Sequence, residues 1–118
     1  MRTRSKAFLV VAFSLGLTLA VYAAEHRDIA QLLRDPSRYY DKEVSISGTV
    51  VDSYGVLGNG AYQVEDGTGR IWVIASGRGV PSRDAWVEVS GSLQETATIK
   101  GKSVGTVLHE IKRFRRSD

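Results

Sequence analysis

The chain has 118 residues, of which 42% are hydrophobic and 25% charged, with no cysteine and a formal net charge of +3. This length suits one small domain, and the composition is that of an ordinary globular protein, which argues against disorder and against several membrane spans. The absence of cysteine excludes disulfides, thiolate metal sites and lipid attachment through a cysteine.

An export signal is predicted at the start of the chain. Three basic residues among the first six precede an uncharged run from Ala7 to Tyr22, and small residues follow that run. These features are typical of a secretory signal peptide over residues 1–23, cleaved after Ala23 or Ala24. We therefore expect a periplasmic or secreted protein. The alternative is a retained anchor, although the run is shorter than the roughly 20 residues that span a bilayer.

The basic isoelectric point of about 9.4 comes largely from this first segment. Three of the 16 basic residues lie in it, whereas all 13 acidic residues follow it, which leaves 13 basic and 13 acidic residues. The remainder of the chain is therefore formally neutral. Only a local basic cluster would favour nucleic acid or an anionic membrane as a partner.

Residues 24–42 are predicted to form a short helix and a lead-in to the first strand. Asp28 is expected to cap the helix, and Pro36 ends it because the residue before a proline avoids the helical region. The apolar residues of this helix recur at spacings of three and four, and we expect them on one side: Ile29, Leu32 and Leu33.

Five strands are predicted within residues 43–114, because apolar and polar residues alternate there with the period that buries one face of a sheet. They are expected at residues 43–51, 61–65, 70–75, 85–93 and 105–114. Asp66–Gly69 predicts a hairpin turn, residues 55–60 a flexible connection, and residues 96–105 a polar loop or short hairpin. The last strand is expected to bury its apolar residues, Val107, Leu108 and Ile111.

These strands are expected to close into a barrel, since closure removes the open edges that so small a sheet would expose. Gly48 and Gly91 lie inside strands, where glycine indicates a bulge or a sharp coil. We therefore predict an all-β fold, a five-stranded barrel preceded by a short helix and the N-terminal signal segment. Residues 115–118 would form a basic tail.

Three motifs occur in this order: V-x-I-x-G-x-V at Val44–Val50, Y-x-V-x-D-G-T-G-x-I-x-V at Tyr62–Val73, and V-x-V-x-G at Val87–Gly91. Their pattern resembles the OB-fold, and the central motif is similar to strands two and three of anticodon-binding OB domains. The resemblance implies a small barrel of a kind that binds oligonucleotides, sugars, haem or peptides. The helix that this family often has between strands three and four is absent, since residues 77–84 are few and include a proline.

The layout is also similar to the periplasmic haem chaperone of cytochrome c maturation. That resemblance would imply haem attachment through a histidine with a nearby tyrosine in a tail after the barrel. His109 instead lies in the last predicted strand with no tyrosine after it, so we expect no haem and no other cofactor or metal. The second histidine, His26, has no partner that the sequence identifies, and no nucleophile motif is present, so we expect no enzyme.

Candidate binding residues follow from the alternation along strands two and three. If Tyr62 and Val73 face the interior, their neighbours face outwards, onto the surface that OB domains commonly use. Together with nearby aromatic residues, the candidates are Tyr54, Gln63, Glu65, Trp72, Ile74 and Trp86. An exposed aromatic ring stacks on a base for about 1–3 kcal/mol. The alternative is that the tryptophans belong to the core, with Trp72 under the helix or under the loop at Gly77.

A basic cluster ends the chain and includes Lys112, Arg113, Arg115 and Arg116. It would bind phosphates or anionic headgroups, or it is a solvated tail. Two functions are therefore considered. The first is a non-enzymatic periplasmic or secreted module that binds a protein, a peptide or a cell-envelope ligand. The second is single-stranded nucleic-acid binding, against which Glu65, Asp66 and Glu88 near the candidate face count.

Overall fold

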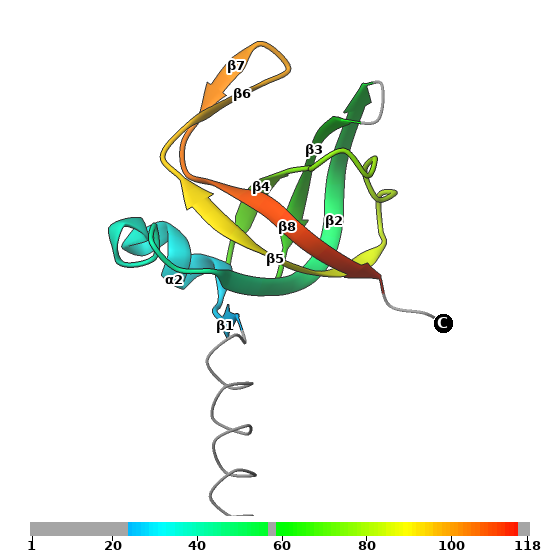
Figure 1. The fold of residues 1–118 in the computed structure, drawn as a ribbon. Helices are drawn as coiled ribbons and strands as arrows, with labels where there is room; N and C mark the ends of the chain where they lie inside the picture. Colours follow the sequence, from blue (N-terminus) through cyan, green and yellow to red (C-terminus); the bar gives the residue numbers. More distant parts are fainter. Residues whose placement is uncertain (1–23, 57–58, 116–118) are drawn as a thin grey trace, which may run out of the picture.

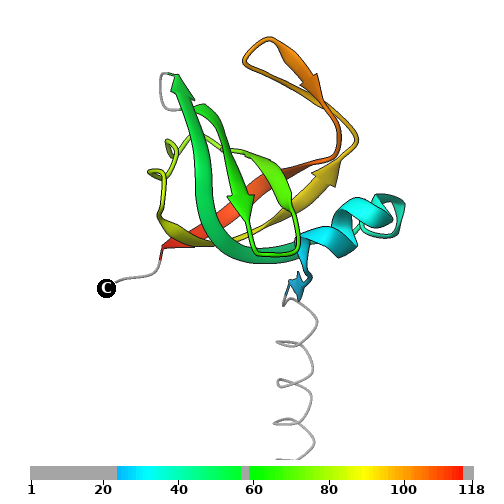
Figure 2. The same ribbon diagram turned by 180° about the vertical axis from the view of Figure 1, so that it is seen from behind.

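The computed structural model describes residues 24–56 and 59–115, so the predicted signal segment and Arg116 lie outside the described residues. The described chain forms a closed five-stranded barrel with one short α-helix (Figure 1). The same closed outline is seen from behind (Figure 2). Within this part of the chain, no helix has the length and apolar character needed to cross a membrane.

The barrel consists of β2 (Val44–Val56), β3 (Asn59–Glu65), β4 (Arg70–Ile74), β5 (Trp86–Gln94) and β8 (Val107–Arg115). Its order is β2-β3-β4-β8-β5, and β5 pairs again with β2 to close the cylinder. Neighbouring strands are antiparallel except β4 and β8, which run parallel. The predicted all-β, OB-like barrel is thus confirmed, together with its five strands.

Shorter elements surround the barrel: β1 (Glu25–His26), α2 (Ile29–Arg34), the 3-10 helix η1 (Pro36–Arg38), β6 (Ala97–Ile99) and β7 (Lys102–Val104). Strands β6 and β7 form a hairpin that projects from one end of the barrel (Figure 1). Of the loop and the hairpin predicted for residues 96–105, the hairpin is therefore confirmed. Strand β1 pairs in parallel with β2. It was not predicted, because two residues carry no periodicity.

The barrel interior is filled by side chains from all five strands and from α2. Ile29 and Leu32 of α2 are fully buried against it, as predicted. The prediction for Leu33 is wrong, since this residue is 39% exposed. A six-residue helix presents only a narrow stripe to the barrel, and two residues fill that stripe.

The turn between β3 and β4 both reverses the chain and holds α2. Asp66 Oδ1 accepts a hydrogen bond from the Thr68 N–H (2.8 Å), and Gly67 has a φ of 90° that favours glycine. Asp66 Oδ2 accepts from the Ile29 N–H (2.9 Å), and the Thr68 hydroxyl accepts from the Ala30 N–H (3.1 Å). Two unpaired N–H groups of the first helical turn are therefore satisfied by a distant loop.

Gly48 lies where β2 passes from pairing with β5 to pairing with β3. The register of β2 breaks two residues later, between Val50 and Asp52. Of the two alternatives predicted at Gly48, the bulge is therefore displaced by two residues, and the sharp coil stays a prediction. A Cβ atom at Gly48 would lie 2.3 Å from the Glu65 carbonyl oxygen, which explains the glycine. The connection predicted at residues 55–60 is shorter than expected, because Gly55 pairs with Gly60 and Val56 with Asn59 in the two strands. Residues 57–58 of that prediction lie outside the described residues.

The bulge indicated by Gly91 is present, and it changes the phase of the last strand. Gly91 pairs with Glu110 and Ser90 with Lys112, so Ile111 is the extra residue. Ile111 is 45% exposed, which corrects the prediction that it is buried. Beyond the bulge, the side chain of Arg113 turns towards the same interior as Glu110.

Candidate functional site

A cleft lies on the outer surface of the barrel, between the β2–β3 hairpin and the β6–β7 hairpin. The two hairpins rise from the same end of the barrel (Figure 1). Its volume is about 160 Å³. Strands β3 and β4 supply its floor, and the residues that line it are Tyr54, Gly60, Ala61, Ile74, Thr98, Ile99 and Lys100.

The floor of the cleft is apolar because alternate residues of β3 and β4 face outwards. Ala61 and Ile74 are cross-strand partners, and their neighbours Tyr62 and Val73 are fully buried inside the barrel. Outside the barrel, Ala61 joins a second hydrophobic cluster beneath the β6–β7 hairpin. We call this group the outer cluster; it comprises buried Ala61, Ile99 and Val107 with partly buried Trp72, Ile74, Ala97 and Val104. An apolar surface that is only partly covered is typical of a binding site.

The rim of the cleft carries one ion pair. Lys100, in the turn of the β6–β7 hairpin, lies with its Nζ 3.4 Å from Asp52 Oδ2 on β2 and 5.5 Å from the centre of the Tyr54 ring. The N–H of Ser53, followed by the charge of Lys100, holds the pKa of Asp52 below its ordinary value. Both partners are at least a third exposed, so this contact joins the hairpins only weakly.

Two of the sequence-predicted binding residues, Tyr54 and Ile74, line the cleft. Two others, Trp72 and Gln63, lie beside it. Trp72 packs in the outer cluster, rather than under α2, and its cross-strand partner is Gln63. The carboxylate of Glu65 is 2.5 Å from the Arg70 guanidinium in an ion pair near the β3–β4 turn. The residues predicted to face outwards from β3 and β4 therefore do so: Gln63, Glu65, Trp72 and Ile74.

Trp86 is not brought to the cleft. It begins β5 opposite Thr49 of β2. Trp72 is instead aligned, through Val107 of β8, with Gln94 at the other end of β5. At about 3.3 Å per residue along β5, this separation is too large for Trp86 and Trp72 to share one small ligand group. The continuous aromatic rim considered from the sequence is therefore not assembled.

Several cleft residues were missed by the sequence reasoning, above all Ile99, Lys100 and Asp52. The pair of Lys100 and Asp52 joins residues 48 positions apart in the chain. The segment of residues 96–105 was interpreted as a polar loop or hairpin, and nothing in its composition indicates which strands it covers. Lys100 and Gly101 both have positive φ, as the two central residues of a tight hairpin turn do. In the sequence, only the glycine at position 101 indicates that turn.

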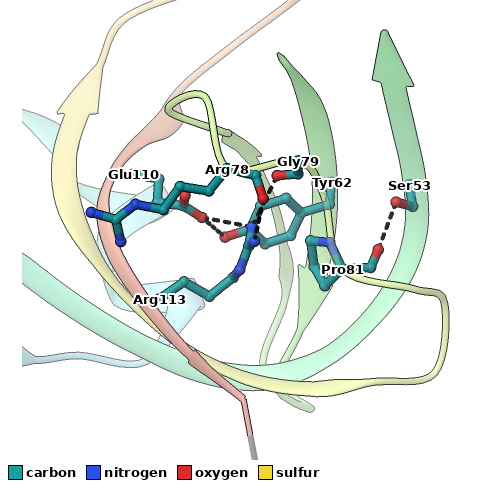
Figure 3. Close-up of polar contacts among 7 residues, drawn as sticks. All are labelled: Ser53, Tyr62, Arg78, Gly79, Pro81, Glu110 and Arg113. Carbon is teal, nitrogen blue, oxygen red and sulfur yellow. Dashed lines mark hydrogen bonds and ion pairs between the residues drawn. The ribbon is translucent and has the colours of Figure 1, made fainter. Parts of the chain in front are cut away.

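Up to Arg115, the last described residue, the basic end of the chain does not form one cationic surface. Arg113 turns inwards, where its guanidinium is 3.0 Å from Glu110 and 5.3 Å from the centre of the Tyr62 ring (Figure 3). Lys112 lies on the outer surface in a pocket that also contains two glutamates. Arg115 is exposed at the end of β8. Three of the four residues that the sequence grouped together thus have three different environments, and the fourth, Arg116, lies outside the described residues.

Glu110 is the centre of a buried polar network that joins β3, β8 and the connection before β5 (Figure 3). The Tyr62 hydroxyl donates to Glu110 Oε2, and Arg113 also donates to the Gly79 carbonyl oxygen at 3.4 Å. Burial, and then the carboxylate of Glu110, raises the pKa of Tyr62 well above its ordinary value. Tyr62 is therefore protonated at any physiological pH and serves as a constant hydrogen-bond donor inside the barrel.

Neither the protein-family models nor the curated proteins contain a match to this chain. Within residues 24–56 and 59–115, no group of three histidine, cysteine, aspartate or glutamate residues is arranged to hold a metal ion. His26 forms a hydrogen bond with the Ser47 hydroxyl at 3.0 Å on the β1 side of the barrel. That pair is remote from the cleft and does not line it.

Proposed function

We propose that this protein is a non-enzymatic binding module, exported to the periplasm or secreted, whose cleft takes a protein segment, a peptide or another cell-envelope ligand. The observation that carries this proposal is the outer cluster, an apolar surface between two hairpins that the β6–β7 hairpin covers only in part. Tyr54 and Lys100 stand at the edge of the opening.

The size and chemistry of the cleft suit one bulky apolar group. A cavity of about 150 Å³ is known to accept a benzene-sized molecule, and the cleft has about 160 Å³. Burying such a group against Ile74 and Ala61 would contribute roughly 25 cal/mol for each Å² of apolar surface removed from water. Lys100 and Asp52 at the rim offer a donor and an acceptor to the polar atoms of a peptide backbone.

The charges around the cleft disfavour the nucleic-acid alternative. Affinity for a polyanion needs cations that are free to replace counterions at phosphates. Two cations near the cleft instead face carboxylates: Lys100 faces Asp52, and Arg70 faces Glu65. Arg113, which the sequence placed in the basic end, faces Glu110 in the interior.

The proposal is tested with peptides selected on the immobilised wild-type protein from a phage-displayed library. Tyr54→Ala removes an exposed ring at the cleft. Trp86→Ala is the matched control, because it removes an exposed aromatic ring that is aligned with Thr49, five residues along β2 from Tyr54, and that does not line the cleft. We expect Tyr54→Ala to weaken binding at least about tenfold, or about 1.4 kcal/mol, and Trp86→Ala to change it less than about twofold.

Equal binding by the wild type and Tyr54→Ala, or a loss confined to Trp86→Ala, would show that the cleft is not the site. Single-stranded oligonucleotides provide the second arm. If they bind more tightly than the selected peptides, and binding falls steeply with salt concentration, the nucleic-acid function replaces the proposed one.

A further inference from the structure

A second pocket, of about 230 Å³, lies on a different part of the outer surface, over β2, β5 and β8. Its lining residues are Ala24, Glu43, Ser45, Glu88, Ser90, Lys112 and Phe114. The strand register explains how they meet. Ser45, Ser90 and Lys112 form one row across β2, β5 and β8, and Glu88 and Phe114 are partners in the next row.

The polar groups of this pocket match a primary ammonium. Two carboxylates, Glu43 and Glu88, and one cation, Lys112, line the pocket, so its lining carries an excess of one negative charge. The Ser90 side chain belongs to a residue that is only 9% exposed, and its Oγ has no hydrogen-bond partner among the described residues. A buried hydroxyl without a partner is unfavourable, and an ammonium would supply it with an N–H donor. Phe114 adds an aromatic ring to the lining, and aromatic rings attract cations.

The chain itself holds a candidate occupant at this place. Ala24 lines the pocket, and it is the residue that becomes N-terminal if the predicted signal segment is cleaved after Ala23. The following backbone is fixed to β2, because the Glu25 N–H donates to the Glu43 carbonyl (3.3 Å) and the Arg27 N–H to the Ser45 carbonyl (2.9 Å). An amino group attached to this segment would therefore have a high effective concentration at the pocket.

We propose that this pocket, which contains Glu43, Glu88 and Ser90, is the binding site for the α-ammonium group that cleavage after Ala23 creates on Ala24. The inference rests on the proposed export of the protein. Before cleavage, the same nitrogen is an amide with one N–H and no charge, whereas the ammonium has three N–H donors and a positive charge. The pocket thus distinguishes the processed chain from the unprocessed chain and anchors the new N-terminus.

The test uses the full chain, expressed with its own first segment in an exporting bacterium and purified from the exported fraction. Mass spectrometry identifies the N-terminal residue, and the rate of α-amine acetylation between pH 6 and 10 gives the pKa of that amine. The charged groups that face it are Glu43, Glu88 and Lys112. We expect a chain that begins at Ala24 and an α-amine pKa about one unit above the ordinary 7.7–8.0.

Glu88→Gln and Glu43→Gln remove the two carboxylates in turn, and we expect each to lower the pKa of the α-amine and to accelerate acetylation at pH 7.5 several-fold. Glu95→Gln is the matched control, since Glu95 is exposed between β5 and β6 and does not line the pocket. An ordinary α-amine pKa in the wild type, or a raised one that neither pocket variant lowers, overturns the proposal.

A mature chain that begins at another residue, or a chain that is not cleaved, overturns it as well. The peptide-binding assay with Tyr54→Ala and Trp86→Ala, made on the same preparations, separates this outcome from failure of the proposed function. Loss of the ammonium site leaves the cleft intact, and loss of peptide binding leaves the α-amine pKa unchanged.

Discussion

The interior of the barrel and the outer cluster are both apolar, but they differ in how completely they are covered. Interior residues such as Ile46 and Val73 are fully buried by five strands and α2. The outer cluster is covered by a single hairpin, and Trp72 and Ile74 remain only partly buried. Alternate residues of β4 contribute to both regions. Inward residues therefore stabilise the fold, and outward residues remain available to a ligand.

The largest expected effect comes from truncating one isoleucine in each region. Ile46→Ala leaves a cavity in a fully enclosed interior, so we expect a loss of about 3 kcal/mol in the free energy of unfolding. Ile99→Ala should cost only about 1 kcal/mol, because the β6–β7 hairpin can close over the space that is left. Urea denaturation of the two variants measures both values.

The same two variants should show the opposite order in peptide binding. We expect Ile99→Ala to weaken binding of the selected peptides about tenfold, because Ile99 lines the cleft, whereas folded Ile46→Ala binds as the wild type does. Similar stability losses together with unchanged peptide binding by Ile99→Ala would mean that the outer cluster is an ordinary part of the core.

A smaller effect concerns the loop that ties α2 to the barrel. Burial raises the pKa of Asp66, but the hydrogen bonds from Thr68, Ile29 and Gly69 outweigh it and lower that pKa below its ordinary value of 3.8. The stabilisation by this carboxylate is present above the unfolded-state pKa and is lost as the pH falls through the folded-state pKa. Asp66→Asn should therefore cost about 1 kcal/mol at pH 7.

The difference in unfolding free energy between the wild type and Asp66→Asn should shrink as the pH falls below about 4. Asp41→Asn, an exposed aspartate before β2, serves as the control and should change the unfolding free energy by less than about 0.5 kcal/mol. A difference that stays constant between pH 7 and pH 3 would show that the charge of Asp66 does not support the helix.

The barrel could be predicted because the patterns that indicate its strands and turns lie within short stretches of the sequence. Alternating residues placed the five strands, the Asp66–Gly69 segment placed one turn, and Gly91 indicated a bulge, all of which the structure contains. The consequence of that bulge could not be read from the chain. The extra residue, Ile111, reverses the alternation and takes Arg113 out of the basic end into the interior.

The candidate site was predictable only in part, for a related reason. Tyr54 and Ile74 follow from the alternation on the strands that form the floor. The side of the cleft that the β6–β7 hairpin forms depends on how this hairpin tilts over the barrel. The contact between Lys100 and Asp52 joins residues far apart in the sequence, and no local pattern predicts it. Trp86 was included because it is aromatic and faces outwards, properties that do not reveal at which end of the barrel it lies.

The most direct test of the central claim is a titration of the ¹⁵N-labelled protein with the tightest selected peptide, followed by the chemical shifts of the backbone amides. Binding in the cleft predicts that the largest changes occur at Tyr54, Ile74, Thr98 and Lys100, and that Trp86 and Glu88 on β5 are spared. Changes centred on β5, with the two hairpins unaffected, would contradict the account.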